Sequence, residues 1–293
     1  MTVQPVDDLS RPRDHYTGYT GYDPAFLRTE VPLPVLTDNQ RLIAAKRVDA
    51  GPEEDPTVLP YPHFSVVMNG MRSLAFYTAV NIEGSQLVDL PRHRDRWFLD
   101  SRIAETEQIG ENLYERNALD RGHLVRRLDP VWGTDAQRAN DDTFHFTNCS
   151  PQHERFNQGQ DLWQGLENFI LNHAEVRDRR ITVFTGPVLG DDDPLYKGVR
   201  LPLAFWKIVV HDKVDGTLAA AAYVLEQGKL IDDFLAEAVF QPGTYRITLT
   251  HLIERTTLDF SYLQDVELPL SSDKLESADR RVLIADNCAN VVA

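Results

Sequence analysis

Residues 119–124 read Leu-Asp-Arg-Gly-His-Leu, and this stretch decides how the rest of the chain is interpreted. A second region continues from it: residues 143–152 read Thr-Phe-His-Phe-Thr-Asn-Cys-Ser-Pro-Gln, residues 156–159 read Phe-Asn-Gln-Gly, and residues 162–167 read Leu-Trp-Gln-Gly-Leu-Glu. We interpret the first stretch as a strand that ends in His123. The whole order then predicts a strand, a second strand, a loop and a helix, which together can wrap around a single ion.

The hydrophobic period changes along the second region. Residues 143–148 alternate as a half-buried strand does, and we predict a strand there. Apolar residues then recur at helical spacing. Asp161, with a glutamine three residues later, has the form of a capping box, so we predict a helix over 161–175. Asn157 then lies in the loop that enters this helix, and Glu167 lies on its second turn.

The composition bounds the class of protein. The chain has 293 residues, enough for a substantial core, and no apolar run long enough to cross a membrane. Its first residues show no basic region followed by an apolar one, which predicts a cytoplasmic location. Secretion by a route that the sequence does not show is the alternative. The formal net charge of −15 argues against a broad electrostatic grip on nucleic acid but leaves room for a small basic cleft.

The two cysteines, Cys149 and Cys288, lie far apart and match no zinc-binding spacing. A buried thiol and a second thiol in the C-terminal tail are therefore favoured over a disulfide.

The remaining segments predict an α+β fold with a central, largely antiparallel sheet and helices on its faces. Residues 1–60, rich in Pro, Asp, Gly and Tyr, are interpreted as an extended arm packed on the body, with one short helix near 39–46. No linker divides the rest, so residues 61–293 are predicted to form one domain, loosely held from about 271.

Several apolar runs are predicted to supply the strands of this sheet. Residues 64–69 and 74–82 flank Asn69-Gly70 and predict a hairpin. Further strands are predicted at 181–189, 203–211, 217–225 and 244–250, with a turn at 212–216 and a short helix or turn at 251–255.

The polar residues of the two opening stretches suit phosphodiester hydrolysis. This reaction needs a base for the attacking water, positive charge on the phosphate oxygens and stabilisation of the leaving oxygen. His123 is a candidate base, because an imidazole titrates near neutral pH. Mg²⁺ could meet the other two needs; it prefers oxygen ligands such as the carbonyl of Asn157, while Glu167 could hold one of its waters. An arginine from the basic run at 92–97 could contact phosphate, with a solvated turn as the alternative.

Each of these residues alone has an ordinary structural explanation. A histidine beside a glycine is more often structural than catalytic, Asn157 before a helix is more often a cap, and a helical glutamate is more often solvated. The functional interpretation therefore depends on the order of all of them.

The ordered set resembles the DNA/RNA non-specific endonuclease family, the ββα-metal (His-Me finger) nucleases that include endonuclease G-like enzymes. Residues 120–123, Asp-Arg-Gly-His, match the family's signature, and 148–152 match its Asn-x-x-Pro-Gln segment. Residues 156–159 with Trp163 and Leu166-Glu167 match its helix entry and helix. The likeness covers roughly residues 60 to 265, where 185–187 and 202–207 also look like family strands.

The resemblance implies a function and a role for each matching position. It implies a Mg²⁺-dependent endonuclease, with Mn²⁺ as a substitute, that cuts DNA and RNA to 5′-phosphate products. His123 would be the general base, Asn157 the metal ligand, and Glu167 would orient a metal-bound water. Arg96 would stabilise the transition-state phosphate. The remaining implied positions, which support the phosphate or the hydrogen bonding of the site, are Arg121 and Asn148.

The sequence departs from the family pattern at two points. The stretch from Asn157 to Glu167 is two residues longer than usual, and we place the extra residues at 160–161, before the helix. Leu171 stands where the family often has an arginine, and Arg177 could supply the phosphate contact in its place. Three other arginines compete with Arg96 for its role: Arg92, Arg94 and Arg102.

Two rival functions stay open. One is a nuclease-like scaffold that binds nucleic acid or a protein without cutting; the acidic net charge and Leu171 favour it, and the complete signature opposes it. The other is a zinc metallohydrolase, which the nine histidines do not support, because none of them shows the spacing His-Glu-x-x-His. An active intracellular nuclease would damage its own cell, so we expect restraint by an inhibitor or regulatory protein. A homodimer is left open.

Overall fold

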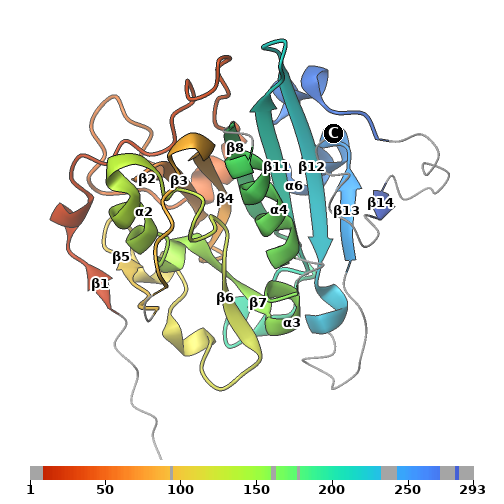
Figure 1. Cartoon of the computed structure of the whole chain (residues 1–293). Helices are drawn as coiled ribbons and strands as arrows, with labels where there is room; N and C mark the ends of the chain where they lie inside the picture. The colour runs from red at the N-terminus through yellow and green to blue at the C-terminus, as the bar shows by residue number, and fades with distance from the viewer. Residues whose placement is uncertain are drawn as a thin grey trace, which may run out of the picture.

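An eight-stranded sheet forms the centre of the molecule. The computed structural model describes residues 9–92, 95–159, 163–176, 179–231, 243–270 and 281–283. The strand order is β14-β13-β12-β11-β8-β4-β3-β2, and every neighbouring pair is antiparallel (Figure 1). The strands are β2 (Val58–Tyr61), β3 (Phe64–Asn69), β4 (Leu74–Glu83), β8 (Arg180–Val188), β11 (Ala204–Asp212), β12 (Leu218–Glu226), β13 (Gly243–Ile247) and β14 (Arg281–Leu283). The α+β architecture predicted from the sequence is confirmed.

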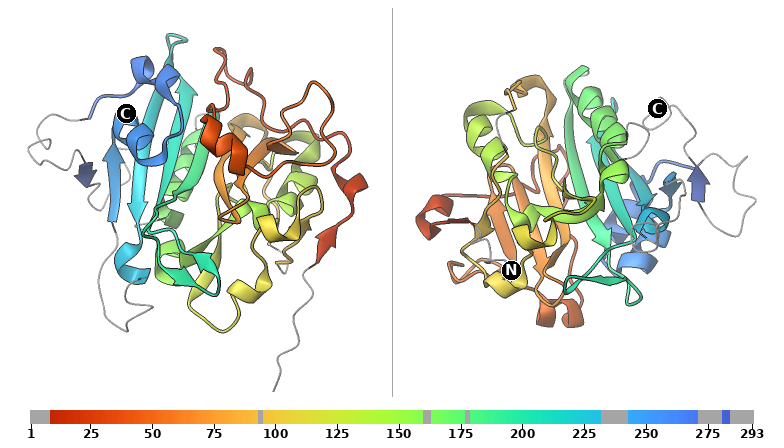
Figure 2. Two further views of the ribbon diagram at one scale, coloured as in Figure 1. Left: turned by 180° about the vertical axis from the view of Figure 1, so that it is seen from behind. Right: turned by 90° about the horizontal axis from the view of Figure 1, so that it is seen from below.

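Both faces of this sheet are covered, so its central strands are apolar on both sides. In β11, Phe205 and Val209 belong to one hydrophobic cluster, whereas Trp206 and Ile208 belong to another. Because side chains of a strand alternate between its faces, each cluster lies on its own side of the sheet. Helix α4 (Trp163–Val176) covers the first face, and α1 (Asp38–Ile43) and α6 (Leu249–Thr256) cover the second (Figure 2).

The remaining elements are short. A two-stranded ribbon, β6 (Leu119–His123) with β7 (Cys149–His153), lies on the α4 side together with α2 (Ala136–Asp142) and α3 (Glu154–Asn157) (Figure 1). Two small pairs are β1 (Ser10–Arg11) with β5 (Leu99–Asp100), and β9 (Leu195–Tyr196) with β10 (Val199–Arg200). The 3-10 turns are Arg13–Tyr16, Gly84–Gln86, Glu105–Glu107, Glu111–Leu113, Gly133–Asp135, Phe146–Asn148 and Ser261–Val266.

Local sequence signals account for several of these elements. The predicted hairpin of β3 and β4 is confirmed, and the side chain of Asn69 accepts hydrogen bonds from the backbone N–H groups of Met71 and Arg72 at 3.1 Å each. The helix predicted near 39–46 corresponds to α1, which begins one residue earlier and is shorter. Thr37 and Gln40 cap it reciprocally. The turn between β11 and β12 contains Gly216 at φ +85, a conformation that favours glycine.

One predicted strand is wrong. Residues 143–148 do not form a strand; Phe146–Asn148 is a 3-10 turn, and the strand that pairs with β6 begins at Cys149. The side chain of Asn148 bonds to the backbone of Val125 and Thr143, which holds the chain in a tight turn and not an extended run. The predicted capping residue Asp161 lies outside the described residues.

The N-terminal arm, described from residue 9, packs directly into the body. Tyr16 and Leu59 belong to the same cluster as α4, and β1 pairs in parallel with β5. Cys149 is a buried free thiol, as predicted, and Cys288 lies outside the described residues. Among the helices that the structure describes, none has the length and apolar character needed to cross a membrane.

Candidate active site

The β6–β7 ribbon carries two of the six residues predicted to form the site, His123 and Arg121, and Asn148 lies directly before its second strand. Asp120 faces Gln152 across the ribbon, and His123 faces Cys149. Gly122 is required at its position, because a side-chain Cβ there would overlap the side chain of Gln152. The close approach of the two strands therefore depends on this glycine of the Asp-Arg-Gly-His signature.

His123 is held by aromatic rings. Its imidazole lies 4.8 Å from the ring of Trp97 and 5.0 Å, edge to face, from the ring of Phe144, measured between centroids. Its Nε2 is buried and has no hydrogen-bond partner among the described residues. Burial lowers the pKa of His123 to about 3, and the nearby arginines 92, 126 and 127 also lower it, whereas Asp95 raises it. The imidazole is therefore neutral at physiological pH and its orientation is fixed by packing.

Asn157 is oriented by the first residue of the signature. It ends α3, and its Nδ2 donates to Asp120 Oδ2 at 2.9 Å; Gln158 Nε2 donates to the same oxygen at 2.9 Å. A carboxylate only accepts, so this bond fixes which end of the amide is nitrogen. The Oδ1 atom of Asn157 is left without a hydrogen-bond donor in the described part of the chain.

Glu167 points into the protein from α4. Its Oε1 lies 3.3 Å from Lys207 Nζ, a buried ammonium on β11. Burial raises the pKa of Glu167 to about 7, with Asp129 adding to the rise, while Lys207 and Arg126 oppose it. The sequence left open whether the longer spacing from Asn157 would turn Glu167 outward; its burial shows that it faces inward. Residues 160–161, where we place the extra length, lie outside the described residues.

Two residues connect α4 and β11 to the end of β6. Trp163 Nε1 donates to the backbone carbonyl of His123 at 3.3 Å, and Lys207 Nζ donates to that of Leu124 at 3.3 Å. The Lys207 ammonium also lies 4.3 Å from the centre of the Trp163 ring. His123 and Glu167 are thus attached to one framework, although they are 44 residues apart in the sequence.

Arg121 and Asn148 both support the ribbon. Arg121 pairs with Glu111 and lies over the ring of Tyr114 at 5.0 Å. Asn148 is fully buried; its Nδ2 donates to the carbonyls of Val125 and Thr143, and its Oδ1 accepts from the N–H of Val125, all at 2.9 Å. Asn148 therefore orders the backbone that follows His123. Direct contact of either residue with a phosphate stays a prediction.

The structure separates the arginines that compete for the phosphate role. Arg96 is exposed beside Phe98 and lines a hollow next to the site, whereas Arg92 is paired with Asp95. Arg102 is fully buried against Asp100, which removes it from the competition. Arg94 and Arg177 lie outside the described residues. Leu171, on α4, is buried in the core between this helix and the sheet.

Three polar residues that lie at the site had no predicted role: Asp120, Glu111 and Lys207. The signal for Lys207 was a lysine within a strand that is otherwise continuously apolar, since such a charge must find a partner when buried. The partnership of Glu111 with Arg121 has no signal in the local sequence.

The residues present fit a hydrated divalent cation. The orphan amide oxygen of Asn157 is a ligand that Mg²⁺ accepts, and the carboxylate of Glu167 is of the kind that binds the waters of such an ion. A second group, His15, Asp142 and His145, brings its ligand atoms within 4.8 Å of one another. Hydrogen bonds explain that group without a metal: His15 Nε2 lies 2.7 Å from Asp142 Oδ1, and Tyr16 Oη lies 3.0 Å from His145 Nε2.

Comparisons with known proteins identify the family of the chain. The family model for DNA/RNA non-specific endonucleases matches residues 44–267. An uncharacterized protein, y4fB, from Sinorhizobium fredii is 41% identical over 269 residues, covering 86% of this chain and 40% of that protein. The mitochondrial nuclease of Saccharomyces cerevisiae is 30% identical over 160 residues, which is 46% of each protein. The chain therefore spans less than half the length of these curated relatives.

Two further relatives connect the chain to endonuclease G. Human mitochondrial endonuclease G is 28% identical over 124 residues, covering 38% of this chain and 40% of that protein. A solved structure, described as the EndoG/EndoGI complex and the mechanism of EndoG inhibition, matches with a TM-score of 0.53 and 19% identity. It covers 72% of this chain and 87% of the solved one, and shows the same fold. The chain belongs to the DNA/RNA non-specific endonuclease family.

Proposed function

We propose that the protein is a Mg²⁺-dependent nuclease that hydrolyses phosphodiester bonds in both DNA and RNA and leaves 5′-phosphate products. One observation carries the proposal: a neutral imidazole, packed against two aromatic rings and free of hydrogen bonds at Nε2 among the described residues, stands on the same strand as the carboxylate that orients Asn157. A structural histidine would be expected to have its ring nitrogens satisfied when buried.

His123 would take the proton of the attacking water. The water oxygen bonds to phosphorus as the bond to the 3′ oxygen breaks, which leaves a 5′-phosphate and a 3′-hydroxyl. The imidazole is unprotonated when the substrate arrives, because burial holds its pKa near 3. The negative charge of the bound phosphate then favours the imidazolium and raises the pKa of His123. Trp97 and Phe144 fix the ring in one orientation throughout.

Asn157 would hold the metal ion through Oδ1, and Glu167 would orient one of the ion's waters. When bound, the ion supplies positive charge to the phosphate and to the leaving oxygen. Arg96 would add a fixed positive charge from the hollow beside Phe144.

A paired digestion tests this proposal. Supercoiled plasmid and a long RNA are incubated with the protein in Mg²⁺ or in EDTA, beside His123→Ala and a matched control, His251→Ala, on α6. We expect degradation of both nucleic acids that requires Mg²⁺ and His123 and is unchanged in the control. Nicked products that a DNA ligase can reseal without prior phosphorylation would confirm 5′-phosphate ends. Wild-type protein that retards DNA on a gel without cutting it would overturn the proposal and support the binding scaffold.

We also propose that a protein inhibitor restrains the activity. A solved relative of the same fold is described in a complex that explains its inhibition. We expect the purified protein to degrade nucleic acid, and an extract of the host cell to suppress this activity. Treating the extract with a protease beforehand should abolish the suppression. Undiminished nuclease activity in untreated extract would contradict the proposal.

A further inference from the structure

A hollow of about 210 Å³ lies beside the candidate active site and gathers positive charge on an otherwise acidic molecule. Three arginines and two phenylalanines form most of its lining, and Asn140 and the acidic Asp141 complete it. The lining residues are Arg11, Arg96, Phe98, Arg127, Asn140, Asp141 and Phe144. In a chain of net charge −15, three arginines around one hollow indicate an anionic ligand.

The hollow shares a wall with the catalytic imidazole. Phe144 lines it and also meets the ring of His123 edge to face. Arg127, on the loop that follows β6, lies close enough to His123 for its charge to act on the imidazole. An anion in the hollow would therefore be a near neighbour of the phosphate that His123 serves.

Arg11 reaches this hollow from the N-terminal arm, outside the region matched by the family model. Its strand, β1, pairs in parallel with β5, so that Arg11 stands opposite Asp100. The guanidinium carbon lies 3.8 Å from the centre of the Phe98 ring, and that of Arg96 lies 5.7 Å from the same ring. Within the described ranges, neither arginine has a carboxylate partner, and Arg11 Nε is buried without a hydrogen bond. Both charges are thus free to meet an anion.

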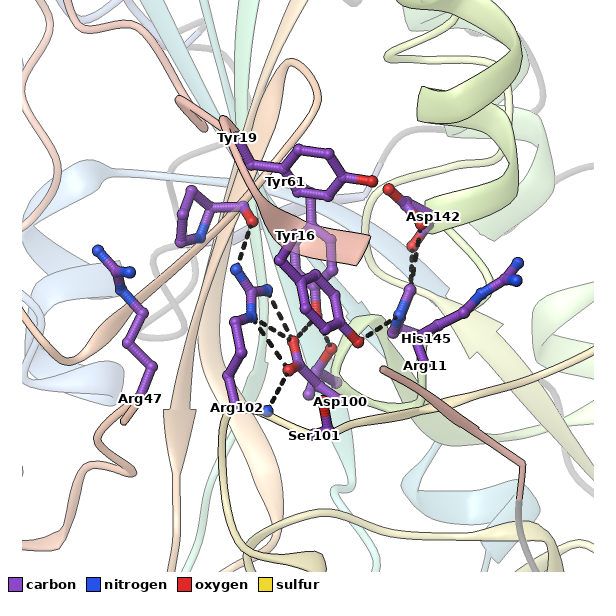
Figure 3. Close-up of polar contacts among 12 residues, drawn as sticks. Arg11, Tyr16, Tyr19, Arg47, Tyr61, Asp100, Ser101, Arg102, Asp142 and His145 are labelled. Carbon is purple, nitrogen blue, oxygen red and sulfur yellow. Dashed lines mark hydrogen bonds and ion pairs between the residues drawn. The ribbon is translucent and has the colours of Figure 1, made fainter. Parts of the chain in front are cut away.

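The arm is fixed five residues after Arg11 (Figure 3). The ring of Tyr16 lies 3.9 Å from the Arg102 guanidinium carbon, and its hydroxyl lies 3.0 Å from His145 Nε2. Arg102 is itself fully buried in an ion pair with Asp100, the residue that lies opposite Arg11 in the register of β1 and β5. Arg11 is therefore presented by a rigid support, so little ordering entropy opposes its contact with a ligand.

We propose that this hollow is a subsite for a backbone phosphate neighbouring the scissile one, and that Arg11 is a substrate-binding residue of the N-terminal arm. The inference rests on the proposed nuclease function, since the ligand is a nucleic-acid strand. Arg11, over the ring of Phe98, holds the neighbouring phosphate, while Arg96, near the same ring, serves the scissile one. The contact reads no base, which suits a nuclease without sequence preference.

The test compares Arg11→Gln with a matched control, Arg13→Gln. Arg13 lies two residues further along the arm, is exposed and bonds only weakly to the Ser101 carbonyl, at 3.4 Å. Binding of a labelled single-stranded oligonucleotide is measured by fluorescence anisotropy in a His123→Ala background over a range of salt concentrations. We expect Arg11→Gln to weaken binding about tenfold and to reduce the salt slope by about one phosphate, with partial recovery in Arg11→Lys. Arg13→Gln should change neither quantity.

Cleavage provides the second readout. Arg11→Gln should lower kcat/KM for cleavage of the oligonucleotide. The relative decrease in kcat/KM should be smaller with bis(p-nitrophenyl) phosphate, a diester without a neighbouring phosphate. Equal effects of the two substitutions, or an unchanged salt slope in a folded Arg11→Gln, would overturn the inference. A wild-type protein that binds the oligonucleotide but cuts nothing would reject the nuclease function, and the anisotropy comparison would still decide the role of Arg11.

Discussion

At the scale of single residues, burial moves the two titratable groups of the site in opposite directions. It lowers the pKa of His123 to about 3 and raises that of Glu167 to about 7. Removing either group from water favours its neutral form, which is the base form of the imidazole and the acid form of the carboxyl group. His123 is thus unprotonated at every pH well above 3, whereas Glu167 becomes a carboxylate only toward and above neutral pH.

This contrast predicts which residue limits activity in acid. The value of kcat/KM reports the free enzyme, so below pH 7 it should fall by about tenfold per pH unit as Glu167 takes up a proton. Raising the Mg²⁺ concentration should move this decline to lower pH, because a nearby cation favours the carboxylate. Rate profiles of the wild type and Glu167→Gln test the assignment. The kcat/KM of the variant should be low and nearly independent of pH between about 5 and 7, the range in which Glu167 titrates. If the kcat/KM of the variant still fell in acid, the titrating group would be a residue other than Glu167.

A second residue-scale prediction concerns the orientation of Asn157. Asp120→Asn replaces an obligate acceptor by an amide, which removes the reason for Asn157 to present its oxygen outward. Loss of such an orienting partner should weaken the apparent affinity for Mg²⁺ by about 10- to 100-fold. The Mg²⁺ dependence of cleavage measures this. Gln158→Ala is the matched control, because Gln158 donates to the same carboxylate oxygen yet is exposed. A similar shift in both variants would show that Asp120 acts only through local packing.

At the scale of elements, the β6–β7 ribbon depends on a glycine. In Gly122→Ala the new methyl group would overlap the side chain of Gln152, which is fully buried. We expect a loss of about 1–3 kcal/mol in the free energy of unfolding, measured by urea denaturation. Trimming the neighbour in Gly122→Ala/Gln152→Ala should recover part of that loss. If the loss of unfolding free energy in the double variant equalled the sum of the losses in the two single variants, the proposed overlap would be absent.

The same elements show where sequence patterns succeed and where they fail. Six of the eight strands of the large sheet were predicted, because apolar runs bounded by turn residues carry the information locally; the hairpin at Asn69 is an example. The two outermost strands, β2 and β14, were missed, since they lie in segments interpreted as an extended arm and a loosely held tail. The strand predicted at 143–148 was wrong, because Asn148 bonds to Val125, 23 residues away, and this contact overrides the local alternation. The apolar strand around Lys207 signals that this lysine needs a buried partner, but only the folded structure identifies that partner as Glu167.

At the scale of the whole molecule, the N-terminal arm and the body share one core. Tyr16 belongs to the hydrophobic cluster that contains α4 and β11, and His15 and Tyr16 bond to Asp142 and His145, about 130 residues later. The same part of the chain brings Arg11 to the hollow beside His123. The arm therefore belongs to the cooperative unit that supports the site, although the family model begins only at residue 44.

Substitutions of Tyr16 test this cooperativity. Tyr16→Ala removes a fully packed ring from above Arg102 and should cost about 3–5 kcal/mol of unfolding free energy. Tyr16→Phe keeps the ring and loses only the hydrogen bond to His145, so about 1 kcal/mol is expected. In both variants, urea unfolding followed by tryptophan fluorescence and by far-UV circular dichroism should remain one coincident transition with a lower midpoint. An arm that docks independently would leave the main midpoint in place and add a separate early transition, because its contacts would then be lost without weakening the sheet.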